Sequence, residues 1–213
     1  IHVKKIREQE RKKHHLTMKY QKELLKNSIK VQESERKRIA ENLHDDVISQ
    51  LYRIQLMNSD RSVGKLIKNS IATTRTISHL LSPPFLQETS LKDLITDFMD
   101  AYKESHSLNF EMNIHQCLEN SYHKLNIYRI FQEVITNCNK HAQANKIDIH
   151  LRVTKVTIAL LISDDGIGIQ SKNRKGMGLK NIESRTQILK GKFKFKRNET
   201  KGTTFVFIAA HGK

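Results

Sequence analysis

Hydrophobic positions in the first part of the chain recur at the spacing of an α-helix. The clearest stripe lies within residues 35–57 and consists of Ile39, Leu43, Val47, Leu51 and Ile54. Intervals of three and four residues place side chains on one face of a helix, so we predict a helix that ends near Met57. Residues 1–34 contain no Gly or Pro and also favour a helix. Their sparse heptad is typical of either a weak coiled coil or a solvated helix that frays.

A second helical stripe follows a turn that we predict at residues 58–64. Its apolar and small polar positions are Leu66, Ile67, Ser70, Ile71, Thr74, Ile77 and Leu81. Pro83 and Pro84 end this helix, and the two helices should fold back on each other as a hairpin. Counting from a turn near Arg61 places Ser78 opposite His44. One hairpin buries little surface, so we predict that two copies of the chain form a four-helix bundle.

The remainder of the chain mixes alternating and helical patterns. Strands are predicted at residues 109–114, 146–153, 156–163, 192–196 and 203–210. Helices are predicted at residues 91–105, 125–142 and 178–189. The fold class is therefore α+β: a helical hairpin followed by an α/β sandwich with its helices on one face of the sheet.

The composition adds a strong positive charge. The 213 residues carry a net charge of +16, which suggests nucleic acid, an anionic membrane surface or a phosphorylated ligand as a partner. Half of this charge lies in residues 1–38, which lack a groove-reading signature and fit the cytoplasmic side of a membrane helix. No apolar run is long enough to span a membrane. We expect the cytoplasmic portion of a protein that an upstream membrane or sensor segment anchors.

The two cysteines, Cys117 and Cys138, show no metal-binding spacing. We expect both to be small buried hydrophobic residues in a reducing compartment.

His44 lies about 100° round the helix from the apolar stripe, so it is exposed or at the edge of a bundle. Glu41 precedes it by one turn, and Asp45 and Asp46 follow it directly. A neutral imidazole has a nucleophilic nitrogen, and a carboxylate that accepts its other N–H fixes the tautomer. Such a histidine on its own is equally typical of an ordinary polar helix face.

Polar residues of the second half suggest a nucleotide site. Glu133 and Asn137 share one helix face and would suit Mg²⁺, with Lys140 and His141 ready to meet phosphate charge. Asp164 ends the most apolar strand and could accept the exocyclic amine of adenine. Each of these patterns alone also fits a polar helix face or a strand exit.

Glycines accompany these polar residues. Gly166 and Gly168 follow Asp164 and allow the backbone to approach a flat ligand. Gly176 and Gly178 precede a helix whose backbone N–H groups could bind an anion, and Arg174 and Lys175 in front of them would form a lid over phosphates. Residues 201–204, Lys-Gly-Thr-Thr, open the last strand and alone predict only a hairpin turn.

The order of these motifs resembles the catalytic core of a bacterial sensor histidine kinase. Residues 36–45 resemble the phosphoacceptor box of the DesK/NarX-like subclass, which pairs with NarL-type response regulators, and residues 128–142 resemble its ATP-binding N box. The resemblance covers residues 35–210. It implies a signalling coil (1–34), a dimerisation and phosphoacceptor hairpin (35–85) and an ATP-binding domain of the histidine kinase/Hsp90/gyrase type (86–213).

The resemblance also implies roles for single residues. His44 would be the phosphoacceptor and Asp45 the base beside it, although Glu41 is a geometric rival. Asn137 would bind Mg²⁺ with the help of Glu133. The residues implied in ATP binding are Asn137, Lys140, His141, Asp164, Gly166, Gly168, Gly176, Gly178, Leu179 and Thr203. The implied cofactors are ATP and Mg²⁺, and the implied partners are a second copy of the chain and a NarL-type receiver domain, with no direct contact to nucleic acid.

The chain departs from the family pattern beside His44. Family members usually carry Gln five residues after the histidine, where this chain has Ser49, followed by Gln50. On a regular helix Gln50 would lie a further ~100° round the axis, facing the bundle seam. This predicts weak phosphatase activity toward the partner regulator. The hairpin arm beyond His44 is also short for the family.

Two other functions remain open from the sequence. A non-kinase ATPase of the same nucleotide-binding fold would not need the helix that carries His44. A basic nucleic-acid-binding protein would account for the net charge alone, and a steep salt dependence of duplex binding would be its signature.

Overall fold

The chain divides into two compact units, Ile1–Ser82 and Pro83–Lys213. The computed structural model describes residues 2–58, 60–83, 86–100, 107–114, 120–168 and 176–210. Within these ranges, no helix has both the length and the hydropathy that crossing a membrane requires.

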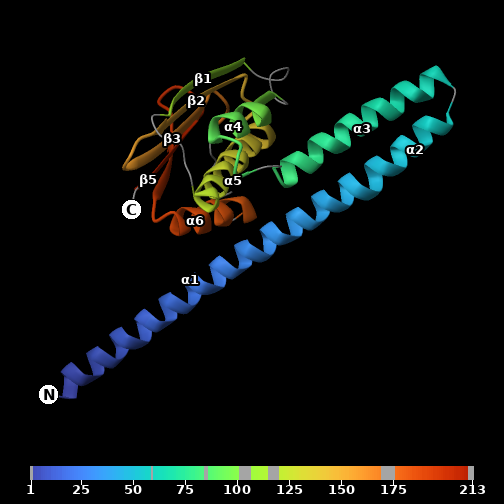
Figure 1. Ribbon diagram of the computed structural model, residues 1–213. Helices are drawn as coiled ribbons and strands as arrows, with labels where there is room; N and C mark the ends of the chain where they lie inside the picture. The colour runs from blue at the N-terminus through green and yellow to red at the C-terminus, as the bar shows by residue number, and fades with distance from the viewer. Residues whose placement is uncertain are drawn as a thin grey trace. The chain divides into compact units, whose positions relative to one another are not determined.

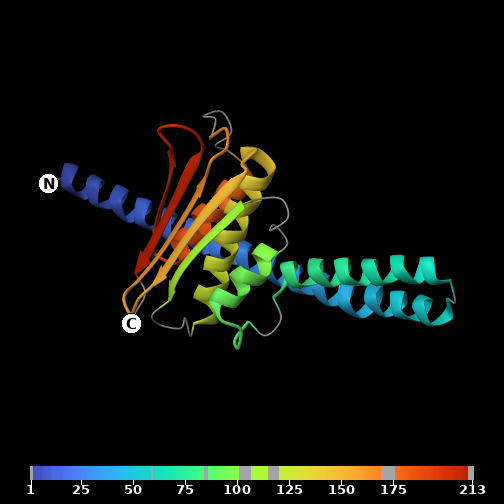
Figure 2. The same ribbon diagram turned by 90° about the horizontal axis from the view of Figure 1, so that it is seen from above.

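The first unit is a helical hairpin with one long arm (Figures 1 and 2). The long arm consists of α1 (His2–Asn42), a π-helical turn η1 (Leu43–Ile48) and α2 (Ser49–Met57), and the short arm is α3 (Arg61–Leu81). The helix α1 is continuous across residue 34, where the sequence suggested the end of a coiled coil.

The turn of the hairpin is shorter than the predicted residues 58–64. Asp60 is the N-cap of α3, because its carboxylate accepts hydrogen bonds from the backbone N–H groups of Ser62 at 2.7 Å and Val63 at 3.4 Å. Gly64 therefore lies inside the first turn of α3, with its N–H bonded to the Asp60 carbonyl. The cap, rather than the glycine, sets where the helix begins.

This shorter turn changes the pairing of the two arms. The Ser78 hydroxyl donates to the Ala40 carbonyl at 3.0 Å. The prediction that Ser78 lies opposite His44 is wrong by about one helical turn, because the chain reverses before Arg61.

The hairpin also buries only part of the stripe predicted on the long arm. Ile48 is buried against Ile67 and Ile71 of α3, with Leu51 packed on the same cluster. Val47 and Ile54 of the predicted stripe are 39% and 51% exposed.

The π-helical turn explains this difference. The buried and half-buried positions of the long arm here are Ala40, Leu43, Ile48, Leu51 and Gln55. They are separated by three, five, three and four residues, and the step of five crosses η1. A π-helix closes its hydrogen bonds over one more residue than an α-helix, so the turn holds one extra residue and the inward face continues with Ile48 in place of Val47.

The second unit contains a five-stranded sheet in the order β1-β2-β3-β5-β4. The strands are β1 (Ser107–Ile114), β2 (Lys146–Val153), β3 (Thr157–Asp164), β4 (Lys192–Arg197) and β5 (Thr203–Ala210). β1 pairs with β2 in parallel, and the other neighbours are antiparallel.

The helices of this unit cover one face of the sheet (Figures 1 and 2). They are α4 (Leu91–Asp100), α5 (Ser121–Asn137), a second π-helical turn η2 (Cys138–Ala142) that continues α5, and α6 (Met177–Ile188). The predicted α+β class, with helices on one face, is confirmed.

Local signals account for most of these elements. The inward positions of β2, β3 and β5 are apolar and buried, as strict alternation requires. The helix predicted to start at residue 125 begins instead at Ser121, because the Asn120 side chain caps it by accepting the His123 N–H at 3.0 Å. Some predicted features lie outside the described residues. They are the end of the helix predicted at 91–105, Cys117, and the basic pair Arg174 and Lys175.

Candidate functional site

His44 lies in the π-helical turn η1 and contacts the residue that follows it. Its Nδ1 atom is 3.0 Å from Oδ1 of Asp45, and the two side chains are 59% and 75% exposed. Glu41, the geometric rival, instead lies 3.6 Å from the Lys37 ammonium group. Adjacent side chains diverge less on a π-helix than on an α-helix, because each residue takes a smaller share of the turn. The turn therefore favours contact between two neighbours that an α-helix would hold apart.

This contact sets the chemistry of the imidazole. When Nδ1–H donates to the Asp45 carboxylate, the proton is on Nδ1 and the lone pair is on Nε2. The exposed ring then presents an unprotonated nitrogen to an incoming electrophile. Asp46 is exposed too, and its carbonyl accepts the Ser49 N–H within the turn.

The π-helical turn also corrects the expected position of Gln50. Because η1 holds one extra residue between His44 and Gln50, Gln50 lies about where the fifth residue after His44 would lie on an α-helix. That Gln50 faces the seam between two copies stays a prediction. Its side chain is exposed.

Asp164 is a buried carboxylate at the end of β3, with only 6% exposure. Its Oδ1 accepts the backbone N–H groups of Gly166 at 3.0 Å and Thr203 at 3.3 Å. The Cys138 thiol lies 3.8 Å from its Oδ2. Burial raises the pKa of Asp164, against the opposing effect of the two backbone hydrogen bonds. The same burial, together with the nearby carboxylate, raises the pKa of Cys138 to about 12, so Cys138 remains a neutral thiol.

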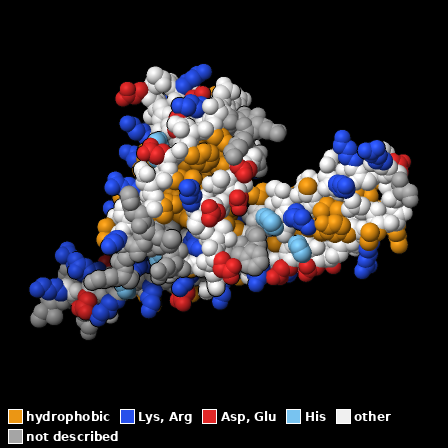
Figure 3. Space-filling view, turned by 45° about the horizontal axis from the view of Figure 1, so that its top comes forward, with side chains coloured by type: hydrophobic (Ala, Val, Ile, Leu, Met, Phe, Trp, Pro, Cys, Tyr) orange, Lys and Arg blue, Asp and Glu red, His pale blue; other side chains and the backbone are white. Residues whose placement is uncertain are grey.

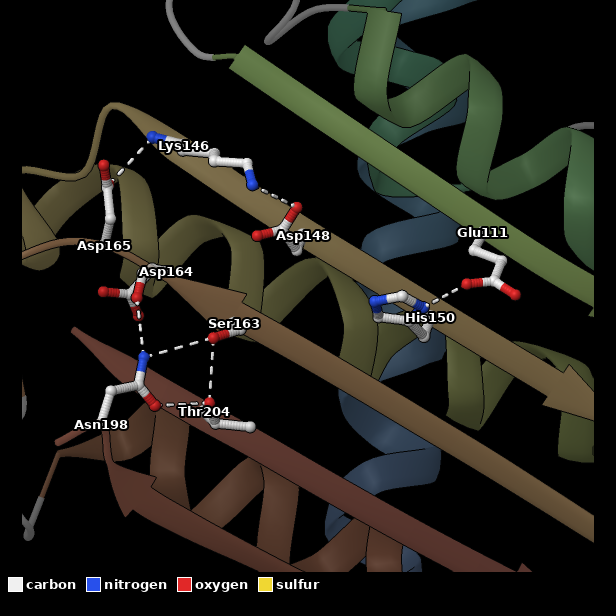
Figure 4. Close-up of polar contacts among 9 residues, drawn as sticks. All are labelled: Glu111, Lys146, Asp148, His150, Ser163, Asp164, Asp165, Asn198 and Thr204. Atoms are coloured by element: carbon white, nitrogen blue, oxygen red, sulfur yellow. Dashed lines mark hydrogen bonds and ion pairs between the residues drawn. The ribbon is translucent and has the colours of Figure 1, made fainter. Parts of the chain in front are cut away.

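The neighbouring Asp165 binds the backbone at the start of β2. Its Oδ1 accepts the backbone N–H groups of Asn145 at 2.8 Å and Lys146 at 2.9 Å, and these bonds lower its pKa. Figure 4 shows its side chain on the β2 side of the strand exit, apart from that of Asp164. Only Asp164 is therefore placed to contact a ligand from within the fold.

Close backbone approaches explain two glycines at this strand exit. A Cβ on Gly166 would overlap the Ala142 carbonyl, which also accepts the Ile167 N–H at 2.8 Å. Gly202 has φ +90° and would clash with the Asp164 carbonyl if it carried a side chain. Gly166 and Gly202 thus let the end of η2, the exit of β3 and the start of β5 pack against one another around Asp164.

Sequence reasoning missed a polar network that supports this exit. The Asn198 amide donates to the Asp164 carbonyl at 3.1 Å and to the Ser163 hydroxyl at 3.3 Å, and its oxygen accepts from Thr204 at 2.6 Å (Figure 4). Asn198 lies in the turn between β4 and β5. Asparagine is common in turns, so the sequence gave no reason to assign it to the site.

The sequence-predicted residues of α5 and α6 meet at the first turn of α6. Glu133 and Asn137 lie one turn apart on α5, both half-buried. A Cβ on Gly178 would overlap the Glu133 carboxylate. Gly176 is the N-cap of α6 and provides no side-chain cap, so the first N–H groups of this helix remain available to an anion.

This donor set fits Mg²⁺ with phosphate oxygens. One carboxylate and one amide oxygen are few ligands, and Mg²⁺ completes its shell with water and phosphate. The described residues contain no group of three or more His, Cys, Asp or Glu that could hold a metal by themselves. Lys140 and His141 are exposed on η2 just after Asn137, Leu179 is half-buried in α6, and Gly168 has φ +80° beyond the β3 exit.

Comparison with known proteins identifies the class of this fold. Residues 123–211, which contain most of α5, all of α6 and four of the five strands, match the family "Histidine kinase-, DNA gyrase B-, and HSP90-like ATPase".

A curated relative extends the match to the hairpin. The chain is 25% identical over 204 residues to the oxygen sensor histidine kinase NreB of Staphylococcus carnosus (strain TM300), which covers 86% of the chain and 58% of the relative. The chain thus spans about 58% of the length of this relative.

A solved structure of low sequence identity shows the same fold. The histidine kinase domain of the Erythrobacter litoralis EL346 blue-light activated histidine kinase matches with a TM-score of 0.52 at 15% identity, over 81% of this chain and 94% of that one. The Acinetobacter baumannii histidine kinase AdeS matches with a TM-score of 0.47 at 17% identity, over 78% and 94% of the two chains. The second unit thus has the fold of this ATPase family, which supports ATP as its nucleotide.

Proposed function

We propose that this chain is the catalytic core of a dimeric sensor histidine kinase. It uses ATP to phosphorylate His44 and then passes the phosphoryl group to an aspartate of a NarL-type response regulator. The observation that carries the proposal is the exposed His44, with Nδ1 against Asp45 at 3.0 Å, in a chain whose second unit has the ATPase fold. The resemblance of residues 36–45 to the phosphoacceptor box supports the NarL type of partner.

The first transfer uses the free nitrogen of His44. The Nε2 lone pair attacks the γ-phosphorus of ATP while the bond from that phosphorus to the bridging oxygen breaks, and ADP leaves with the electron pair. Asp45 accepts the hydrogen bond from Nδ1–H and stabilises the positive charge that the ring gains. In the second transfer a carboxylate oxygen of the regulator attacks the phosphorus, the N–P bond breaks, and His44 regains its neutral form.

The second unit orients the nucleotide in this proposal. Asp164 accepts the adenine amine with the carboxylate oxygen that the backbone N–H groups leave open. Gly166, Gly168 and Thr203 border the base through the strand exit.

The phosphate end of the nucleotide lies by the first turn of α6. Gly176, Gly178 and Leu179 offer the start of this helix to the triphosphate, with Lys140 and His141 adding positive charge. Asn137 would hold Mg²⁺ with the help of Glu133, and the ion would supply positive charge next to the phosphate oxygens.

The hairpin supports dimerisation in the same proposal. Hydrophobic side chains that its own core leaves exposed include Val47 at 39%, Leu66 at 67% and Ile77 at 45%. A second copy would cover such residues in a four-helix bundle. The basic segment at residues 1–38 supports a place next to the cytoplasmic surface of a membrane.

Incubation with γ-labelled ATP tests the proposed activity. A kinase transfers the label to the protein in a form that acid removes and base does not, as expected for a phosphorus–nitrogen bond. A non-kinase ATPase would release labelled phosphate and leave the protein unlabelled. Tight, salt-dependent binding of duplex DNA without labelling would instead favour the nucleic-acid-binding alternative.

A further inference from the structure

The face of the sheet opposite the helices has an apolar centre. An antiparallel sheet with one solvated face normally alternates apolar residues inward with polar residues outward. In β3 and β5, however, the outward positions include Ala159, Leu161, Val206 and Ile208. The register places Leu161 beside Val206 and Ala159 beside Ile208. Val206 is 39% and Ile208 49% exposed, so these four residues, the apolar strip, form a contiguous patch of the kind that marks interaction sites.

Basic side chains border the apolar strip on β4. Lys194 pairs with Val206 and Lys192 with Ile208, so these lysines and Lys196 lie on the same outward face. The described residues provide no ion-pair partner for any of these three lysines.

The other border of the strip lies on β2. His150 pairs with Leu161 and Arg152 with Ala159. His150 Nδ1 is 2.9 Å from the Glu111 carboxylate, and Asp148, which pairs with Ser163 on the same face, is 3.1 Å from the Lys146 ammonium group. Both acidic groups of this border therefore have basic neighbours, whereas Arg152 has no ion-pair partner within the described ranges. Figure 3 shows hydrophobic side chains gathered on this unit with Lys and Arg side chains around them.

The dimensions of this face suit one α-helix. We call the apolar strip and its two basic borders the trough, because the Lys and Arg side chains of the borders are longer than the Ala, Val, Leu and Ile side chains between them. Neighbouring strands are ~4.8 Å apart, which puts β2 and β4 about 14 Å apart across the strip. An α-helix with its side chains is about 10–12 Å wide. A hydrogen-bonded cluster of Ser163, Thr204 and Asn198 closes one end of the trough (Figure 4).

We propose that this trough is a docking surface for an amphipathic α-helix of a partner protein that carries acidic residues along both flanks. Its apolar face would cover the apolar strip and complete a third layer over the sheet. Its acidic flanks would pair with the lysines of β4 and with Arg152.

The charge and shape of the trough argue against other occupants. The helix α1 of this chain and a second copy of this unit are both basic, so they would place like charges at the borders. A membrane surface is the remaining alternative occupant, and the vesicle experiment below tests it. The proposal does not depend on kinase activity.

A designed peptide tests the docking surface on the full chain. The peptide is an amphipathic helix of about 18 residues, ~27 Å long, with a leucine stripe between two glutamate flanks and a fluorescent label. Binding is followed by anisotropy for the wild type and for Val206→Asn, Lys194→Glu and Lys92→Glu. Lys92 is exposed in α4, and the helices cover the other face of the sheet, so Lys92→Glu makes the same charge change as a control. We expect Val206→Asn and Lys194→Glu to weaken binding about tenfold or more, and Lys92→Glu less than twofold.

Two further probes make the outcome decisive. The same peptide with lysine flanks should bind at least tenfold more weakly than the glutamate version, and thermal unfolding should show that every variant remains folded. Equal binding of the two peptides, no binding of the glutamate peptide, or wild-type affinity in both trough variants would overturn the proposal. Binding of the wild type to anionic phosphatidylserine vesicles that Val206→Asn abolishes, without peptide binding, would replace the partner helix by a membrane.

Discussion

Gly178, in the first turn of α6, lies so close to the Glu133 carboxylate of α5 that a Cβ would overlap it. This approach joins the two helices that carry the proposed phosphate and Mg²⁺ ligands. The φ of Gly178 is not in the left-handed region, so it is this contact, and not the backbone conformation, that a side chain would disturb. The atoms met belong to the flexible Glu133 side chain, so a methyl group would displace the proposed Mg²⁺ ligand.

Gly178→Ala should consequently weaken Mg-ATP binding about tenfold or more, because the Glu133 carboxylate or the start of α6 must move. Titration with a fluorescent ATP analogue measures this. Gly64→Ala is the matched control, since a Cβ there meets nothing within 4 Å in α3. It should leave nucleotide binding unchanged and stabilise the hairpin by up to about 1 kcal/mol. Equal nucleotide affinity in Gly178→Ala and the wild type would contradict this account of the site.

The pH dependence of ATP binding should report Asp164. Burial raises the pKa of this carboxyl above its ordinary value of 3.8, and the charged form accepts a hydrogen bond from the adenine amine more strongly than the neutral form does. Affinity should therefore fall as the pH drops through this raised pKa, earlier than for an exposed aspartate. Affinity titrations between about pH 4 and 7 should show this fall in the wild type, and a weaker but flatter profile in Asp164→Asn.

The thermal stability of the second unit without ATP should rise as the pH drops, whereas the ATP affinity should fall. A carboxyl whose pKa is higher in the folded than in the unfolded state binds its proton first in the folded state. Between the raised pKa and the ordinary value, Asp164 therefore makes the unliganded unit more stable as the pH falls. The melting temperature of the wild type minus that of Asp164→Asn, measured as a function of pH, isolates the contribution of this carboxyl group. A difference of the opposite sign would show that Asp164 is not the group responsible.

The hairpin stripe shows where the sequence pattern reaches its limit. Ile39, Leu43, Val47 and Leu51 follow α-helical spacing, yet the buried residue of the middle turn is Ile48. Periodicity assumes a constant rotation per residue, and a π-helical turn breaks this assumption without a local signal such as Gly or Pro. The strands and α5 were predictable because strict alternation and a long apolar stripe come from local repeats.

The candidate site divides in the same way. Asp164, Gly166 and Gly178 were predictable from local motifs, since each follows a strand or opens a helix. The reason why Gly166 and Gly178 carry no side chain was not predictable. The Ala142 carbonyl and the Glu133 carboxylate approach these two glycines only in the folded unit. Asn198 reaches Asp164 from 34 residues away, and such a contact depends on the sheet order.

Gln50 provides a functional test of the π-helical turn. The turn places Gln50 where the fifth residue after His44 lies on an α-helix, so we now expect phosphatase activity toward the partner regulator, in contrast to the sequence-based expectation. Gln50→Ala should reduce the decay of phosphorylated regulator about tenfold, and Ser49→Ala should have little effect. Decay is measured with ADP and purified regulator. If Gln50→Ala kept full phosphatase activity, Gln50 would not take part in the dephosphorylation of the regulator.

A one-residue deletion tests whether η1 contains an extra residue that packing does not need. Removal of the exposed Asp46 should convert η1 to a regular α-helix while Ile48 and Leu51 keep their packing, so the melting temperature should be unchanged or higher. Deletion of the exposed Ser70, between Ile67 and Ile71 of α3, should lower it by several degrees. Strong destabilisation by the Asp46 deletion would show that the extra residue is needed for packing.

Dimerisation should depend on exposed apolar residues of the hairpin. Burial of a Val side chain contributes about 1.5 kcal/mol or more, and each residue occurs twice in a symmetric dimer. Val47→Lys should therefore raise the dimer dissociation constant about 100-fold or more, as seen in sedimentation at micromolar concentration. Val156→Lys, at a 67% exposed valine in the second unit, should leave the dimer intact. A monomeric wild type would remove the basis for the proposed bundle.

The most direct measurement is the position of the phosphoryl group after incubation with γ-labelled ATP, in the wild type, in His44→Gln and in a mixed dimer of His44→Gln with Asn137→Asp. We predict acid-labile label on His44 of the wild type, and none in His44→Gln, which still binds Mg-ATP with wild-type affinity. In the mixed dimer, any label should be on the Asn137→Asp chain, which retains His44. Label on another residue of His44→Gln would contradict the assignment of His44 as the phosphoacceptor.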